Sequence, residues 1–130
     1  MDFRSLRGKI ELLGFSLENE NMSGSFGDHV STYNSPYFRL RIVGDRGQRR
    51  IDLAFNDQPQ EWFDLGLVLF SLGLAKDDLA PISFEDGVSF LENYSTKIRE
   101  LFNKKNGPQM KSRLLAMMNA RAKKMFPGKI

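Results

Sequence analysis

Hydrophobic and polar residues alternate along two short runs in the first half of the chain, on either side of a glycine-containing turn. The hydrophobic positions of the two runs are Phe38, Leu40, Ile42, Ile51, Leu53 and Phe55. A period of two is typical of a β-strand with one buried face. Centring the turn on Arg46–Gly47 pairs Leu40 with Leu53 and Arg41 with Asp52, whereas a shift of one residue would set Leu40 against Asp52. The pattern therefore predicts an antiparallel hairpin in a single register, with Leu40 and Leu53 on the buried face.

Four segments have hydrophobic residues at steps of three and four, which predicts helices. The first is residues 2–13, and the second is residues 61–74, which are hydrophobic around the whole circumference and predict a buried central helix. A third helix is expected to begin at Ser83, whose hydroxyl can cap it. The fourth is expected at about residues 108–126, with Pro108 in its first turn and a methionine-rich stripe that faces the core or a partner.

The remaining segments give weaker strand signals. Residues 15–28 are polar and predict a weak strand followed by a loop, and Asp28–Tyr33 predicts a strand at the edge of the sheet. Together the elements predict a single α+β domain over residues 1–130. Its expected arrangement is an N-terminal helix, a small antiparallel sheet of three or four strands with the hairpin at its centre, and then three helices packed on one face.

Charge is divided sharply along the chain, although the net charge is only +3. From Lys104 to the end there are eight basic residues and no acidic one, so the first 103 residues hold the other 11 basic residues and all 16 acidic ones, a net charge of −5. Such a division indicates a protein that steers a charged partner, or else two solvated faces that bind nothing.

The charge division gives two candidate binding surfaces. The acidic candidate consists of Asp57, Glu61, Asp64, Asp77 and Asp78. The basic alternative consists of Arg46, Arg49 and Arg50 of the hairpin together with Arg121, Lys123 and Lys124 of the last helix, and Arg39 and Arg41 lie on the strand before the turn.

The residues that catalysis or metal binding usually requires are scarce. There is no cysteine and His29 is the only histidine, which excludes thiol chemistry, disulfides and two-histidine sites. The adjacent carboxylates at 77–78 and 85–86 fall where loops and helix caps are expected. The turn at 44–47 lacks the lysine and the following helix of a phosphate loop. We therefore expect no catalytic residues, no metal and no cofactor, and a binding protein in preference to an enzyme.

The start of the sequence lacks the layout of a signal peptide, and no apolar run approaches the length that spans a membrane. We therefore expect a cytoplasmic protein with no membrane partner.

Residues 33–67 resemble small bacterial immunity proteins of contact-dependent growth inhibition and related toxin systems. The resemblance rests on Tyr33-x-Ser35-Pro36, the Asp45-Arg46-Gly47-Gln48 turn, Asp52 and Trp62-Phe63-Asp64-Leu65. It implies an intracellular protein that neutralises a protein toxin by binding it. The acidic surface would suit a nuclease toxin, whose substrate cleft is basic. The alternative is a small nucleic-acid-binding or regulatory domain that uses the basic last helix and the hairpin arginines.

Overall fold

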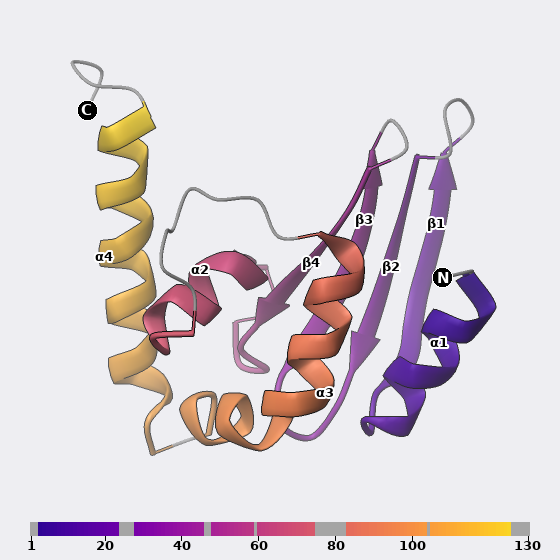
Figure 1. The fold of residues 1–130 in the computed structure, drawn as a ribbon. Coiled ribbons are helices and arrows are strands. Elements are labelled where there is room, and N and C mark those ends of the chain that lie inside the picture. Colours follow the sequence, from indigo (N-terminus) through magenta and orange to yellow (C-terminus); the bar gives the residue numbers. More distant parts are fainter. Residues whose placement is uncertain are drawn as a thin grey trace.

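One helix, five strands and then three helices follow one another in a computed structural model of the chain, which describes residues 3–23, 28–45, 48–58, 60–74, 83–103 and 105–125. These residues form an α+β fold with one antiparallel sheet of five strands and four helices (Figure 1). In chain order the elements are α1 (Phe3–Leu12), β1 (Ser16–Ser23), β2 (Asp28–Asn34), β3 (Arg39–Asp45), β4 (Gln48–Ala54), β5 (Phe63–Asp64), α2 (Leu65–Ser71), α3 (Phe84–Leu101) and α4 (Gly107–Met125).

Strands that follow one another in the sequence are neighbours in the sheet, so the sheet is a meander with β1 at one edge and β5 at the other. The register predicted for the hairpin is confirmed. Leu40 stands opposite Leu53, and Arg41 stands opposite Asp52. Leu40 and Leu53 are fully buried. Alternation along β3 and β4 therefore sends one set of side chains into the core and the other to the opposite face.

The helices cover one face of the sheet and one of its edges. In Figure 1, α3 lies in front of the sheet and α1 lies in front of β1, whereas α2 and α4 stand to the side, beyond β4. Close packing of α3 on the sheet depends on Gly87, because a Cβ there would lie 3.3 Å from both the Ile51 and Leu65 side chains. At Gly107, the first residue of α4, a Cβ would lie 3.5 Å from the ring of Phe55, which is an ordinary van der Waals contact.

A series of aromatic contacts joins these layers at one end of the molecule. The ring of Phe102, which caps α3, lies 5.3 Å from that of Phe38 and 4.4 Å from that of Phe55, centroid to centroid. Phe38 in turn contacts Phe15, and Phe55 contacts Phe63. All five rings are buried. Their packing holds the β1, hairpin and β5 segments together beneath the end of α3.

The strand predicted at Asp28–Tyr33 is confirmed as β2, but its predicted position at the edge of the sheet is wrong. β2 lies between β1 and β3, so β1 forms the edge and the sheet has five strands, not three or four. Residues of β1 are polar, which made the strand signal weak. Two glutamates of β1 form ion pairs with other elements. Glu20 pairs with Arg7 of α1, and Glu18 pairs with Arg39 of β3.

The predicted helix over residues 61–74 is shorter in the structure. It begins at Leu65, because Phe63 and Asp64 pair with β4 as a short strand, and Asp64 then caps α2 by accepting a 2.8 Å hydrogen bond from the Leu67 nitrogen. The expected cap at Ser83 is confirmed by a 3.2 Å bond from the Asp86 nitrogen. The expectation of three helices on one face is only partly right, since α2 and α4 lie at the β5 side (Figure 1).

Leu53→Ala should lower the free energy of unfolding by about 2–5 kcal/mol, because it removes a fully buried side chain from the sheet. Leu12→Ala makes the same chemical change where the side chain is 88% exposed, and it should alter the free energy by less than about 0.5 kcal/mol. Urea unfolding of both variants is the measurement. Equal costs at the two positions would contradict the register of β3 with β4.

Candidate functional site

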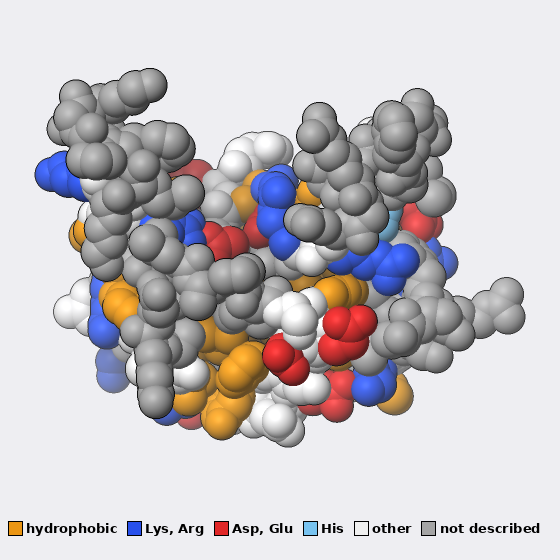
Figure 2. Space-filling view, turned by 45° about the horizontal axis from the view of Figure 1, so that its top comes forward, with side chains coloured by type: hydrophobic (Ala, Val, Ile, Leu, Met, Phe, Trp, Pro, Cys, Tyr) orange, Lys and Arg blue, Asp and Glu red, His pale blue; other side chains and the backbone are white. Residues whose placement is uncertain are grey.

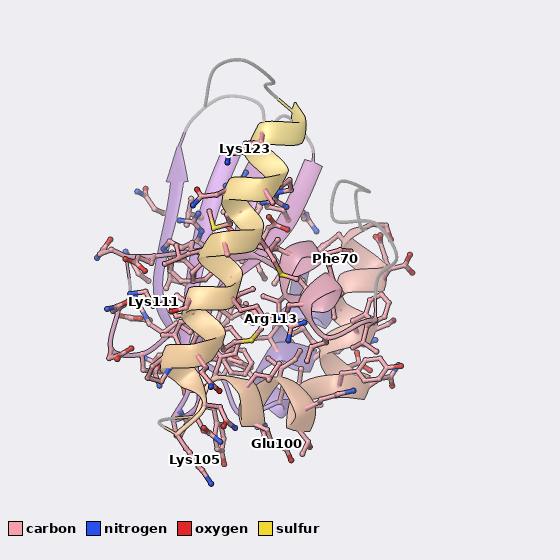
Figure 3. All side chains as sticks on the ribbon, turned by 90° about the vertical axis from the view of Figure 1, so that its left-hand side faces the viewer. Phe70, Glu100, Lys105, Lys111, Arg113 and Lys123 are labelled. Carbon is pink, nitrogen blue, oxygen red and sulfur yellow. The ribbon has the colours of Figure 1, made fainter. Side chains whose placement is uncertain are left out.

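The sheet face opposite α1 and α3 is covered by no helix of the described part of the chain (Figures 1 and 3). Arg39 and Arg41 of β3 and Arg50 and Asp52 of β4 lie on this face, because they alternate with buried hydrophobic residues. Trp62, which precedes β5, lies beside them. We call Arg39, Arg41, Arg50, Asp52 and Trp62 the arginine–tryptophan cluster.

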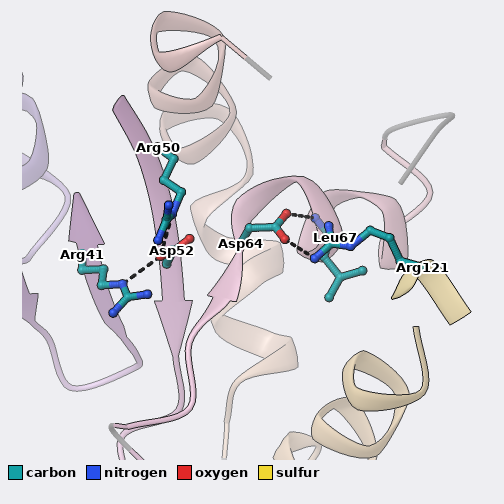
Figure 4. Close-up of polar contacts among 6 residues, drawn as sticks. All are labelled: Arg41, Arg50, Asp52, Asp64, Leu67 and Arg121. Carbon is teal, nitrogen blue, oxygen red and sulfur yellow. Dashed lines mark hydrogen bonds and ion pairs between the residues drawn. The ribbon is translucent and has the colours of Figure 1, made fainter. Parts of the chain in front are cut away.

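Asp52 is the anchor of the cluster. Its side chain is only 4% exposed, and its Oδ2 accepts hydrogen bonds from Arg41 Nε at 2.7 Å and from Arg50 Nε at 3.3 Å (Figure 4). A buried carboxylate is stable only when such partners replace its hydration. Both contacts use the Nε atom of the arginine, so the Nη groups of Arg41 and Arg50 are not consumed by Asp52.

The ring of Trp62 fixes two of the guanidinium groups. Arg41 Cζ lies 4.7 Å from the ring centroid and Arg39 Cζ lies 5.5 Å from it, within the range of cation–π attraction. Arg39 also pairs with Glu18 of β1. Only 15% of the Arg39 side chain and 25% of the Arg41 side chain are exposed. The two arginines are therefore held in place before any partner arrives.

Alternating charges continue from the cluster to α4. Asp52 stands directly opposite Asp64 on β5, and two like charges in such a pair repel. Each carboxylate has its own cation, because Asp52 is paired with the hairpin arginines and Asp64 is paired with Arg121 of α4 (Figure 4). The ion pair to Arg121 thus ties the second half of α4 to the sheet edge.

The predicted acidic surface is only partly free. Asp57 is exposed in the turn after β4. Glu61, however, pairs with Lys111 at 3.0 Å and Asp64 pairs with Arg121, so the basic helix α4 offsets both charges. Asp77 and Asp78 lie outside the described residues. Figure 2 shows basic and acidic side chains interspersed, not separated into two regions, on the face in view.

The predicted basic surface is not brought together as one patch. Arg50 belongs to the cluster, whereas Arg49 lies on the other face of β4, with its Cζ 5.6 Å from the ring of Phe84 on α3. Arg121 is paired with Asp64, and Lys123 is exposed near the end of α4 (Figure 3). Arg46 and the side chain of Lys124 are outside what the structure describes.

Trp62 is the residue of the cluster that sequence reasoning missed. It opens a largely hydrophobic run, whose pattern predicts one buried helix. The position of Arg41 opposite Asp52 was predicted, and it was the signal that could have located the cluster. A charged cross-strand pair flanked by Arg39 and Arg50 marks the polar face of the hairpin.

A second polar group lies under α1. Arg7 Nη2 donates to both carboxylate oxygens of Glu20, each at 2.8 Å. Burial raises the pKa of the Tyr33 hydroxyl, with the neighbouring Arg7 acting in the opposite direction. Interactions with Tyr33 and then with Glu20 raise the pKa of Arg7. Since Tyr33 is fully buried, this group fastens α1 to the sheet and offers no open binding surface.

Neither a metal centre nor a relative identifies the site. Within the described ranges, no three His, Cys, Asp or Glu side chains are grouped so that they could hold a metal ion. The helices of those ranges include none that is long and apolar enough to cross a membrane. Comparison of the chain with protein-family models, curated proteins and solved structures gave no match. The function is therefore inferred from the chemistry of the cluster.

Asp52→Asn should lower the free energy of unfolding by about 1–3 kcal/mol, because the two arginines would then donate to a neutral amide oxygen in place of a buried carboxylate. It should also shift the emission of Trp62, the only tryptophan, as Arg41 loses its anchor. Asp57→Asn, at an exposed position, is the matched control and should change neither quantity. Urea unfolding followed by tryptophan fluorescence measures both. An unchanged Asp52→Asn variant would mean that Asp52 does not hold the arginines.

Proposed function

We propose that this chain is a protein-binding antidote, an immunity protein that neutralises a bacterial toxin by docking on it directly. The observation that supports this best is the arginine–tryptophan cluster. Trp and Arg are the side chains that most often dominate the binding energy of protein interfaces. Here Arg39 and Arg41 are already stacked on Trp62, so docking would cost little side-chain entropy.

The cluster also agrees with the resemblance of residues 33–67 to immunity proteins. Asp52 and Trp62, which belong to the motifs that carry the resemblance, are the anchor and the stacking platform of the cluster. Asp64, from the same motifs, caps α2 and pairs with Arg121. Those motif residues therefore shape a single surface and its support, which is what a docking function requires.

The acidic residues provide a weaker case for the docking surface. Glu61 and Asp64 are offset by Lys111 and Arg121, and such paired carboxylates attract a basic cleft less than free ones. A nuclease as the toxin would therefore depend on Asp57 and on residues beyond the described ranges. We propose the cluster as the primary contact and the acidic residues as a secondary one.

Trp62→Ala should weaken binding to the toxin by about 30-fold or more and abolish protection, because truncation of a central interface tryptophan typically costs 2 kcal/mol or more. A candidate toxin is sought among the products of genes adjacent to the one for this protein, co-expressed for growth assays and titrated calorimetrically. Tyr37→Ala removes an aromatic side chain, 47% exposed, outside the cluster, and it should retain protection.

Two results would count against the proposal in different ways. A Trp62→Ala variant that folds and still binds as tightly as the parent would remove the cluster from the docking surface. Failure of the parent chain itself to bind or protect against the neighbouring toxin would overturn the antidote function.

Nucleic-acid binding through α4 is the second candidate, and one observation favours it. Arg113 and Lys123 are exposed on α4, a helix that contains no acidic residue (Figure 3). Neither is among the ion pairs of the described residues. Free cations along one helix can meet phosphates, which are attracted most strongly at low salt.

Arg113→Gln combined with Lys123→Gln should reduce the slope of log affinity against log salt by up to about 1.8 for duplex DNA, if each cation neutralises one phosphate. Fluorescence anisotropy of a labelled duplex at several salt concentrations gives the slope. We expect the parent chain to bind weakly at most, because residues 1–103 carry a net charge of −5. No binding at the lowest salt concentration would eliminate this candidate.

A further inference from the structure

We infer that the arginine–tryptophan cluster is a receptor for an acidic segment of the partner protein, in which an Asp or Glu carboxylate sits on the Nη groups of Arg41 and Arg50 beside Trp62. The inference rests on the proposed function, because it names the chemistry that the partner presents to the docking surface.

The way in which Asp52 holds the two arginines carries the inference. The Arg41 and Arg50 side chains converge on Asp52 from adjacent strands, and both reach the same oxygen through Nε (Figure 4). A guanidinium has five donors, and contact through Nε leaves the Nη donors for another acceptor. The Arg50 side chain is 57% exposed and that of Arg41 is 25% exposed, so the Nη donors of Arg50 are the more accessible to a partner. Paired guanidinium groups recognise carboxylates with defined geometry.

The local charge favours a protein carboxylate over a nucleic acid. Two carboxylates, Glu18 and Asp52, pair with the three arginines of the cluster. The sum of these charges is a single excess positive charge. One excess charge suits one carboxylate, whereas binding to a nucleic-acid strand usually neutralises several phosphates. A nucleic-acid strand that crossed this face would also approach Glu18, whose side chain is 42% exposed and whose charge repels phosphates.

The same sheet face offers an apolar contact next to the arginines. Val30 of β2 is paired with Val43 of β3 on this face, and Val30 is 36% exposed. Trp62 is partly buried and presents the remaining ring surface. The segment that fits would therefore combine acidic with apolar side chains, because its carboxylate would meet the arginines while an apolar neighbour covers Val30 or Trp62.

The single tryptophan makes the test direct, since all tryptophan emission comes from the cluster. The probe is a short synthetic peptide of glutamate and leucine, titrated at low salt while the emission of Trp62 is followed. We expect a saturable change that weakens as salt is added. The same peptide with glutamine in place of glutamate should give no saturable change, and oligothymidylate of similar length should bind less tightly than the acidic peptide.

Charge-removing variants locate the binding site. Arg50→Gln affects an exposed side chain and should preserve folding, and it should weaken peptide binding by about tenfold. The double variant with Arg41→Gln should abolish binding, and circular dichroism must show that it still folds, because it removes both cations from the buried Asp52. Arg113→Gln removes one exposed arginine from α4 instead and should leave the affinity unchanged. No response of Trp62 to the acidic peptide, equal binding by Arg50→Gln, or tighter binding of oligothymidylate would each overturn the inference.

Failure of this inference can be distinguished from failure of the antidote function. If the toxin binds the parent and the Arg41→Gln, Arg50→Gln variant equally well, the receptor is wrong and the antidote function stands. If the peptide binds as expected but the neighbouring toxin does not, the antidote function is wrong and the receptor for acidic segments stands.

Discussion

The register of β3 against β4 is the constraint on which both faces of the sheet depend. It sends Leu40 and Leu53 to the core and sends the neighbouring pair, Arg41 and Asp52, to the open face. A shift of one residue would put charged groups into the core and hydrophobic groups on the surface, which is costly on both counts. The pairing that makes the core therefore also makes the anchor of the arginine–tryptophan cluster, and the cluster cannot form unless the hairpin folds correctly.

Much of the charge division in the sequence is satisfied within the molecule. Asp64 pairs with Arg121 and Glu61 pairs with Lys111, so the basic helix lies against part of the acidic segment. Such partly exposed ion pairs contribute little stability individually. Burial of Met110 and Leu114 is the main force that holds α4, and the ion pairs set its position along the β5 edge. Among the described residues, the exposed charges include those of Arg50 in the hairpin, Asp57 after β4, and Arg113 and Lys123 of α4.

The sequence was sufficient for features that depend on nearby residues. The hairpin register and the cap at Ser83 follow from spacing over a few positions, and both were predicted. Features that depend on distant residues were not predicted. The polar strand β1 pairs with β2 along its length, its glutamates meet Arg7 and Arg39 from other elements, and Arg121 meets Asp64 across 57 positions.

The short strand β5 was missed for a different reason. A strand of two residues has no period, so the hydrophobic run that contains β5 and α2 looks like one helix. Interpreting Trp62 as part of that helix hid the platform on which Arg39 and Arg41 stack. The candidate site could thus be predicted as a charged cross-strand pair, but its aromatic member required the tertiary structure.

Stability alone does not account for the cluster. A buried carboxylate with its arginines is no more stabilising than well-packed hydrophobic residues of similar volume, because desolvation of the charges offsets their attraction. Asp52 nevertheless occupies a position that is almost fully buried, and it orients Arg41 and Arg50 by their Nε atoms alone. The arrangement gains little for folding while it holds hydrogen-bond donors at a fixed place on an open face. The proposed docking function would give the cluster a physical reason that the fold by itself does not supply.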